Sequence, residues 1–311
     1  MTLHTLSTDR STLHGAFSRD RAPVLTIDSG DTVRFSTLDA GWNVEAPWAN
    51  EGAGRKFEGM VKGADDGHAL CGPVAVQGAE PGMTLEIQIG ALVTGAWGWT
   101  AATGWPSPLN RRLGLHEGQS ERLEWTLDRE AMTGKDQHGH VVALHPFMGV
   151  MGLPADAPGY QSTTPPRFCG GNMDCKELVT GTSLFLPIAV SGALFSTGDG
   201  HGAQGDGESG GTAVECPMES ADLTFILHPD LTITTPRARA DKGWLTFGFD
   251  EDLDEAMAIA LDAMLTLMNE KLGVPRREAM ALASVVVDLR VTQVVNTVRG
   301  VHAVLPHDAL M

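Results

Sequence analysis

Positive charge and cysteine are both scarce in this 311-residue chain, and each shortage excludes a class of partner or structure. Only 22 Lys and Arg residues oppose 39 Asp and Glu residues, which gives a net charge of −17. Such a charge repels nucleic acid and anionic membranes, so we expect neither as a partner. The cysteines form no CxxC pair, and we expect free thiols rather than a disulfide framework at Cys71, Cys169, Cys175 and Cys216.

Long apolar runs are also missing. No stretch approaches the roughly 18 to 20 apolar residues that a membrane-spanning helix needs. The first twenty residues, MTLHTLSTDRSTLHGAFSRD, are polar and contain no apolar core of a secretion signal. We therefore expect a cytoplasmic protein.

What the chain does contain is many short β-like runs separated by turn signals. Leu85, Ile87 and Ile89 alternate with polar residues, which is the period-2 pattern of a half-buried strand. Strands with short turns and no interleaved helices favour a sandwich or barrel. The remaining strands are predicted within 22–38, 72–93, 141–144, 183–195, 211–216, 222–227 and 244–249, with Pro/Gly-rich loops at 97–110 and 149–169.

Two helices are predicted near the C-terminus, over 252–273 and 275–288. Acidic residues begin the first helix, Gly273 suits its end, and Pro275 suits the start of the second. Residues 291–304 return to a β-like pattern. We predict one domain over 1–311, β-rich over 1–250, helical over 251–289 and β-like over 290–306. The first helix is expected to bury a stripe made of Leu253, Met257, Leu261, Met264, Leu265, Met268 and Leu272.

The stretch STGDGHGAQGDGESGG, residues 196–211, matches several unrelated motifs. Its GxGxxG and GxSxG matches both need a helix to follow, and none is predicted there. An EF-hand loop beginning at Asp199 fails because Ala203 stands at its fifth position. A metal site built from Asp199, His201, Asp206 and Glu208 survives, with a solvated acidic surface loop as the plain alternative.

Several blocks around that stretch resemble the acetamidase/formamidase family. They are GGNMD at 170–174 with TGTSLFLPI, GALFSTGDGHGAQGDGE at 192–208, GPVAVQGAEPGM at 72–83, and DLRVTQVVN and GVHAVLP near the end. The resemblance runs from about residue 20 to the end. It implies hydrolysis of a small linear amide such as formamide or acetamide, with release of ammonia and a carboxylate. It also implies a mainly β (α+β) subunit of β/β/α layers that dimerises into an α/β/β/α stack.

The resemblance further implies a divalent metal, zinc and/or calcium, and a set of site residues. The hypothesis assigns the metal to Asp174, His201, Asp199 and Glu215, and catalysis to Glu208, Asp206 and Asn172. Glu208 is the expected base that takes a proton from metal-activated water. Three more residues are possible participants: His68, Gln204 and His145.

Two other interpretations of the sequence need comparison with this one. Cys175, Lys176 and Glu177 contain the residue types of a nitrilase-type amidase, but consecutive side chains do not converge, so we do not expect that triad. The rival function is a β-sandwich binding or structural protein whose acidic loop holds calcium for stability alone. In either case a layered subunit is expected to pair into a homodimer or a higher even homo-oligomer.

Overall fold

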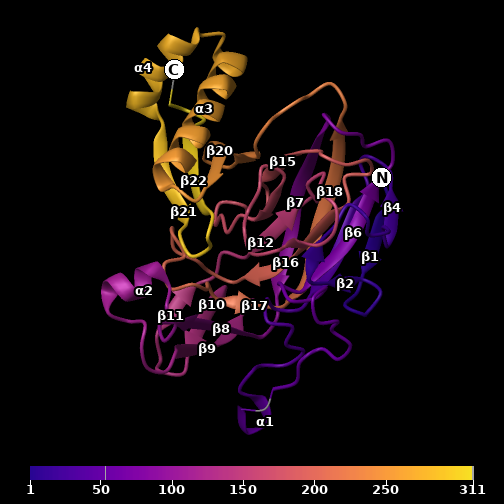
Figure 1. Cartoon of the computed structure of the whole chain (residues 1–311), viewed down its shortest axis with the longest axis vertical. Coiled ribbons are helices and arrows are strands. Elements are labelled where there is room, and N and C mark those ends of the chain that lie inside the picture. Colours follow the sequence, from indigo (N-terminus) through magenta and orange to yellow (C-terminus); the bar gives the residue numbers. More distant parts are fainter. Residues whose placement is uncertain (53, 310–311) are drawn as a thin grey trace.

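The computed structural model describes residues 1–52 and 54–309, and these form a mainly β protein with two C-terminal helices (Figure 1). A nine-stranded sheet, here sheet A, has the order β1-β5-β18-β7-β15-β19-β20-β22-β21. Its strands are β1 (Leu3–Leu6), β5 (Thr32–Thr37), β7 (Thr84–Thr94), β15 (Ser183–Pro187), β18 (Met218–His228), β19 (Arg237–Ala240), β20 (Gly243–Asp250), β21 (Asp288–Gln293) and β22 (Arg299–Pro306).

A second sheet of eleven strands, sheet B, has the order β11-β10-β9-β8-β17-β16-β12-β14, with β6 pairing with β16, β2 and β4. Its strands are β2 (Leu13–His14), β4 (Leu25–Ile27), β6 (Leu70–Val76), β8 (Trp97–Ala102), β9 (Glu121–Asp128), β10 (Thr133–Asp136), β11 (Val141–Ala143), β12 (Phe147–Gly152), β14 (Gly170–Asn172), β16 (Phe195–His201) and β17 (Glu215–Cys216). The small pieces β3 (Ala16–Phe17) and β13 (Gln161–Ser162) pair with each other, and α1 (Ala49–Gly52) and α2 (Pro108–Leu113) are short helices.

The main hydrophobic core lies between the two sheets. Phe195 on β16 of sheet B packs against Phe35 on β5 and Phe225 on β18 of sheet A, with ring centroids 6.2 and 5.0 Å apart. All three rings are fully buried. Edge-to-face aromatic packing of this kind joins the sheets face to face.

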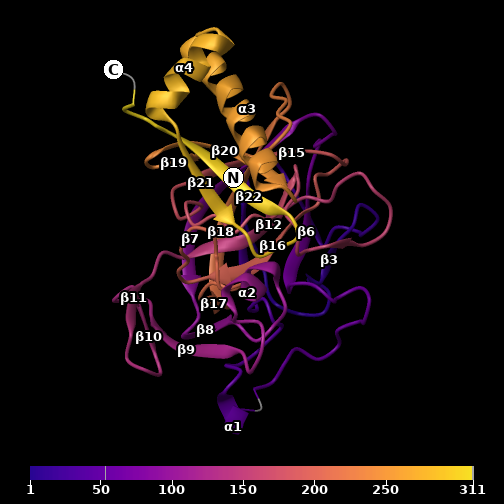
Figure 2. The same ribbon diagram turned by 60° about the vertical axis from the view of Figure 1, so that its left-hand side comes forward.

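The C-terminal helices add a third layer on sheet A. Helix α3 (Leu253–Leu272) lies over β20 and β22, and helix α4 (Arg276–Val286) packs against α3 and contacts β22, as Figure 2 shows. Thr246 on β20 faces α3 and donates a hydrogen bond to the carbonyl oxygen of Ala260 at 2.7 Å, while Phe247 faces the main core. The alternation of strand side chains thus serves both layers, and the predicted β/β/α order of the subunit is confirmed. None of the helices in the described residues is long and apolar enough to cross a bilayer.

The predicted apolar stripe on α3 is correct in part, since Met264, Leu265 and Met268 are buried as expected. Ala256 and Ala260 are fully buried, whereas Met257 and Leu272 are exposed. The reason is close packing: Gly248 of β20 lies directly against the backbone of Ala256, so small side chains are needed on the face of α3 that meets the sheet. The ends of α3 agree with prediction, since Asp252 caps its start and Gly273 closes it at φ 69°.

Other differences are local. The predicted strand 183–195 ends at Pro187, and a new strand, β16, then begins at Phe195. The first part of the glycine-rich stretch, residues 196–201, is therefore buried strand rather than loop. The region 97–110, predicted as a loop, contains β8 and the start of α2. Glycines in these segments suggest turns when the sequence is considered alone. In the structure they allow neighbouring strands to approach closely.

Candidate metal centre

Five ionisable side chains from separate segments meet in the interior beside sheet B. Asp199 and His201 share one face of β16, since they are two residues apart in a strand. Glu215 on β17 lies opposite His201 in the antiparallel register. Asp174 comes from the turn after β14, and Glu208 from the loop after β16. Their exposed fractions are 3, 0, 3, 1 and 7%, so Glu208 is the most accessible of the five.

The neighbouring strand β12 leaves room for this cluster at Gly149. A β-carbon at position 149 would lie 2.7 Å from Asp199 Oδ2, 2.9 Å from Asp174 Oδ1 and 2.9 Å from His201 Cε1. The Gly149 carbonyl also accepts a hydrogen bond from the amide of Met173 at 3.1 Å, which holds the turn that carries Asp174. A glycine is required here because any side chain would enter the space between the ligand-type atoms.

Three of the carboxylates stand on strained backbone. Asp174, Asp199 and Glu208 have φ angles of 48, 59 and 44°, in the left-handed region that non-glycine residues rarely adopt. Each such residue costs on the order of 1 kcal/mol, and strain of this kind gathers at functional sites. These strained backbone conformations direct the three side chains toward one centre.

His201 is oriented by a second ring of contacts. Its Nδ1 lies 3.0 Å from Gln204 Oε1, and Gln204 Nε2 donates to the carbonyl oxygen of Asp174 at 2.7 Å. With Nδ1–H donating to Gln204, Nε2 is left facing the carboxylates, 3.4 Å from Asp199 Oδ1 and 3.2 Å from Glu215 Oε2. Support of one imidazole nitrogen by a polar partner is typical of metal-ligating histidines.

The donor atoms of the cluster fit a divalent cation. Among the described residues, both carboxylate oxygens of Asp174, Asp199 Oδ1, His201 Nε2 and Glu215 Oε2 are buried without a hydrogen-bond partner. Buried polar atoms are rarely left in this state, because each one loses its water without replacement. Two sets of side chains bring ligand atoms within 4.8 Å of one another, and both use His201: the first has Asp174 and Glu208, and the second has Asp199 and Glu215. Carboxylate oxygens with one imidazole suit zinc, manganese or calcium.

Burial and neighbouring charges shift the pKa of every member of the cluster. Burial, reinforced by the charges of Asp199 and Glu215 against the opposing effect of His201, raises the pKa of Asp174 to about 8. Burial likewise raises the pKa of Glu215 to about 7. Burial also raises the pKa of Glu208 well above its usual range, with the charge of Asp174 adding to it. Burial opposes ionisation of Asp199, but the charges of His201 and His68 and its hydrogen bonds together lower its pKa. Burial also opposes the charge on His201, yet Glu215 and Asp199 raise its pKa. A cation would replace these protons.

A cavity of about 740 Å³ opens onto the cluster. Asp199, Glu208 and Glu215 line it together with Asn172 and His68. Glu208 also lines a larger cavity of about 1570 Å³ on its other side, which contains His145 and Gln204. The smaller cavity reaches the ligand-type carboxylates Asp199 and Glu215, which do not line the larger one.

The remaining predicted site residues lie at different places around the two cavities. Asn172 is 4% exposed; its Nδ2 donates to the carbonyl oxygen of Thr164 at 3.0 Å, and its Oδ1 is buried without a partner. His68 is half-buried, with Nδ1 2.9 Å from Thr163 Oγ1. His145 is exposed at the wall of the larger cavity.

The structure does not bring Asp206 to the cluster. Its Oδ2 accepts from Arg290 Nε at 2.9 Å, its Oδ1 lies 3.1 Å from Lys176 Nζ, and its side chain is 34% exposed. Although burial raises the pKa of Asp206, hydrogen bonds from these two cations outweigh it and lower the pKa. The spacing of acidic residues could not reveal this, because the chain reverses direction between Gln204 and Glu208.

Sequence reasoning missed two residues. Gly149 was one glycine among 37, and only the register of β12 against β16 places it at the cluster. Asp39 is fully buried near the smaller cavity, where it accepts hydrogen bonds from Trp99 Nε1 at 2.7 Å and Asn43 Nδ2 at 2.7 Å. Burial raises the pKa of Asp39. No motif marked it.

The fold and the centre together define a two-sheet β protein with a buried carboxylate–histidine centre suited to a divalent cation. The model of the Acetamidase/Formamidase family matches residues 154–232, and this range contains all five residues of the cluster. This part of the chain is therefore similar to that family.

Known proteins are similar to the chain over more of its length. A putative formamidase of Schizosaccharomyces pombe is 28% identical over 64% of this chain, which spans 60% of that relative's length. The structure of a predicted acetamidase/formamidase from Thermoanaerobacter tengcongensis superposes with a TM-score of 0.84 at 25% identity, covering 98% of this chain and 96% of that one. An acetamidase structure from Bacillus halodurans gives 0.83 at 26% identity, with 97% of each chain covered.

Proposed function

We propose that the protein is a metal-dependent amidase that hydrolyses a small linear amide of the formamide or acetamide type to ammonia and the carboxylate. The observation that carries the proposal is the buried cluster of Asp174, Asp199, His201, Glu208 and Glu215, with unpartnered ligand-type atoms at the end of a cavity. The family model that matches residues 154–232 and the formamidase and acetamidase names of similar proteins support the reaction type.

The more buried residues of the cluster are assigned to metal binding, and the more accessible Glu208 is assigned to proton transfer. Asp199, His201 and Glu215, with Asp174 at their side, are the more deeply buried members and would hold the cation. A divalent cation held there would supply Lewis-acid chemistry, polarising an amide carbonyl and lowering the pKa of water. Glu208 faces the cavity, accepts the proton of the attacking water, and returns it to the departing nitrogen as ammonia leaves. The unpartnered Oδ1 of Asn172 accepts an N–H of the substrate amide and orients its carbonyl.

The experiment measures ammonia release from a panel of linear amides, before and after removal of metal by a chelator. We expect turnover of formamide or acetamide, its loss on chelation, and its return with added zinc, manganese or calcium. His201→Asn should fold and remain inactive. The rival calcium-stabilised binding protein predicts the opposite pattern: chelation lowers the melting temperature, and no amide is hydrolysed under any condition.

We further propose that the β/β/α subunit assembles into a homodimer or a higher even oligomer of α/β/β/α layers in the cytoplasm. The layered subunit and the match to the family model support this arrangement. Light scattering of the purified protein tests it, and a monomer at micromolar concentration would contradict it.

A further inference from the structure

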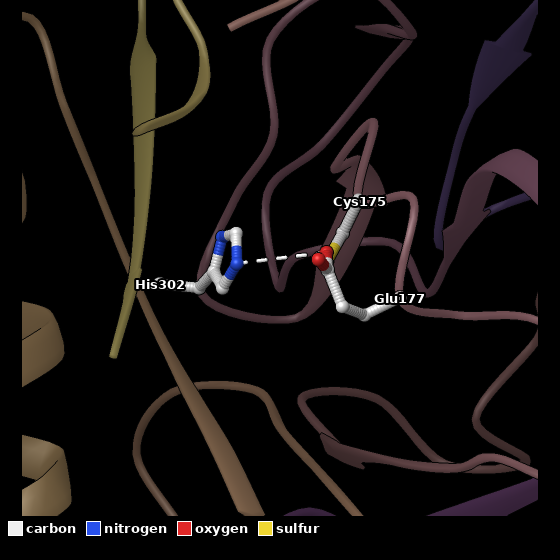
Figure 3. A group of neighbouring side chains, drawn as sticks. All are labelled: Cys175, Glu177 and His302. Atoms are coloured by element: carbon white, nitrogen blue, oxygen red, sulfur yellow. Dashed lines mark hydrogen bonds and ion pairs between the residues drawn. The ribbon is translucent and has the colours of Figure 1, made fainter. Parts of the chain in front are cut away.

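A second group of metal-type ligands lies apart from the cluster already described. Cys175 and Glu177 come from the turn after β14, and His302 comes from β22 of sheet A (Figure 3). Cys175 Sγ donates to Glu177 Oε2 at 3.3 Å, and His302 Nε2 lies 3.5 Å from that same oxygen. The sequence argument against a Cys175–Lys176–Glu177 triad holds for Lys176, which turns away to Asp206. Cys175 and Glu177 nevertheless converge, because they are two residues apart and a third partner comes from a distant strand.

The histidine is buried and aimed into this group. Val301 and Ala303 face the helices of the third layer, so His302 faces the opposite side of β22 and is 0% exposed. Its Nε2 is buried without a hydrogen-bond partner, and its Nδ1 lies 2.8 Å from Thr292 Oγ1. A hydrogen bond from Nδ1–H to that hydroxyl leaves the lone pair of Nε2 directed at Glu177 and Cys175, as a ligating histidine requires. Burial lowers the pKa of His302 to about 4, so the imidazole is neutral.

Two of the three separations between these ligand atoms suit ligands around one small cation. Bond lengths of about 2.3 Å to sulfur and 2.0 Å to nitrogen or oxygen place tetrahedral ligands roughly 3.3–3.5 Å apart. The measured separations of 3.3 and 3.5 Å agree, and all three ligand atoms lie within 4.8 Å of one another. Glu177 is fixed for this role, because its other oxygen accepts from Arg290 at 2.6 Å.

We propose that Cys175, Glu177 and His302 form a second metal site, selective for zinc or a similar borderline-soft cation. A thiolate and an imidazole are poor ligands for calcium or magnesium, so this site differs in selectivity from the carboxylate-rich centre. Glu177 lines the cavity of about 1570 Å³, which gives the cation a path of entry and leaves the fourth position to water or a small ligand. On binding, the Cys175 proton is released to solvent and the sulfur becomes a thiolate ligand.

Such a site joins two parts of the molecule. His302 belongs to the strand that carries the helical layer, and Cys175 directly follows Asp174 of the carboxylate-rich centre. A cation held by both would fix the turn that presents Asp174. The two centres thus differ in their types of ligand, although Asp174 and Cys175 are adjacent in the sequence.

The test uses the full chain, stripped of metal and titrated with Co²⁺, because a cobalt–thiolate bond gives a near-ultraviolet charge-transfer band. We expect the band in the wild type, in Cys216→Ser and in Cys169→Ser, and its loss in Cys175→Ser. Cys216 is the important control, since it is buried beside Glu215 of the other centre. A wild type without the band, or a band that disappears in Cys216→Ser and persists in Cys175→Ser, overturns the proposal.

Two further measurements keep the test decisive if Cys175→Ser fails to fold. Zinc-edge X-ray absorption of the zinc-loaded wild type should show a sulfur neighbour at about 2.3 Å. His302→Gln should bind one equivalent of zinc less than the wild type, with the carboxylate-rich centre still loaded. A zinc spectrum with only oxygen and nitrogen neighbours, or unchanged stoichiometry in a folded His302→Gln protein, shows instead that the thiol serves only as a hydrogen-bond donor.

Discussion

Gly149 and Asp199 face each other across adjacent strands, so closely that a β-carbon on residue 149 would lie 2.7 Å from Asp199 Oδ2. The same added carbon would meet Asp174 and His201 at 2.9 Å. The strand β12 therefore shapes the centre by the absence of a side chain. The space kept open is the space that a cation bound by these residues would occupy.

Replacing Gly149 with alanine should abolish metal binding at the carboxylate-rich centre, because the methyl group competes with the cation for this space. Gly205→Ala is the matched control: it lies in the same region, and its β-carbon meets nothing within 4 Å. Metal content after reconstitution and formamide turnover are the measurements. Normal metal content and turnover in a folded Gly149→Ala protein would refute this explanation of the glycine.

The metal-free protein should become less stable as pH rises. Glu215 keeps its proton to a pKa of about 7 in the folded state against 4.5 in the unfolded chain, and Asp174 to about 8 against 3.8. Between about pH 4 and 8 the unfolded chain therefore binds fewer protons than the folded one, and the free energy of unfolding falls. The raised pKa of His201 acts in the same direction above pH 6.5. Urea unfolding at several pH values in chelator should show the fall, and zinc should reduce it.

Asp174→Asn should stabilise the metal-free protein and destroy metal binding. The amide removes a fully buried acid from among other carboxylates, and asparagine tolerates the left-handed backbone at φ 48°. We expect a gain of about 2 kcal/mol at pH 8, within the range found when buried charged groups are replaced.

Asp206→Asn is the control for that substitution and also tests the sequence-based hypothesis that Asp206 is catalytic. Because its ion pairs are partly exposed, the loss should be about 0–1 kcal/mol, with metal binding and turnover retained. Thermal melts and metal analysis of both variants decide between the two roles. A stable, metal-bound but inactive Asp206→Asn protein would restore Asp206 as a catalytic residue.

Glu208→Gln should lower kcat for formamide by roughly 10²- to 10⁴-fold, since that is the usual contribution of a general base. The variant should keep its metal, because Asp199, His201, Glu215 and Asp174 remain. The bell-shaped pH profile of the wild type should lose one limb. If Glu208→Gln instead loses the metal, Glu208 is a ligand and another group carries the proton.

The fold was largely predictable because its signals are local. Period-2 alternation in β7, the acidic start of α3 and Gly273 at its end all report the backbone directly. The face that α3 buries was not predictable in this way. It depends on Gly248 of a different element, and hydrophobicity alone assigned Met257 to the core rather than Ala256.

The candidate site shows the same division. Asp199, His201 and Glu208 were identified by their motif, and their burial in one cluster agrees with it. Asp206 belongs to the same motif but pairs with Arg290, some 84 residues later in the chain. Gly149 and the meeting of His302 with Cys175 depend on strand register between distant segments, which no single-sequence pattern contains.

The most direct test of the whole account is formamide turnover measured against bound metal in one series of samples. Stripped protein is reloaded in steps, and the metal bound at each step is counted alongside the rate of ammonia release. The account predicts that the rate rises in proportion to occupancy of the carboxylate-rich centre and stays at the background level in His201→Asn. Full turnover by the metal-free protein, or no ammonia from the fully loaded one, would contradict it.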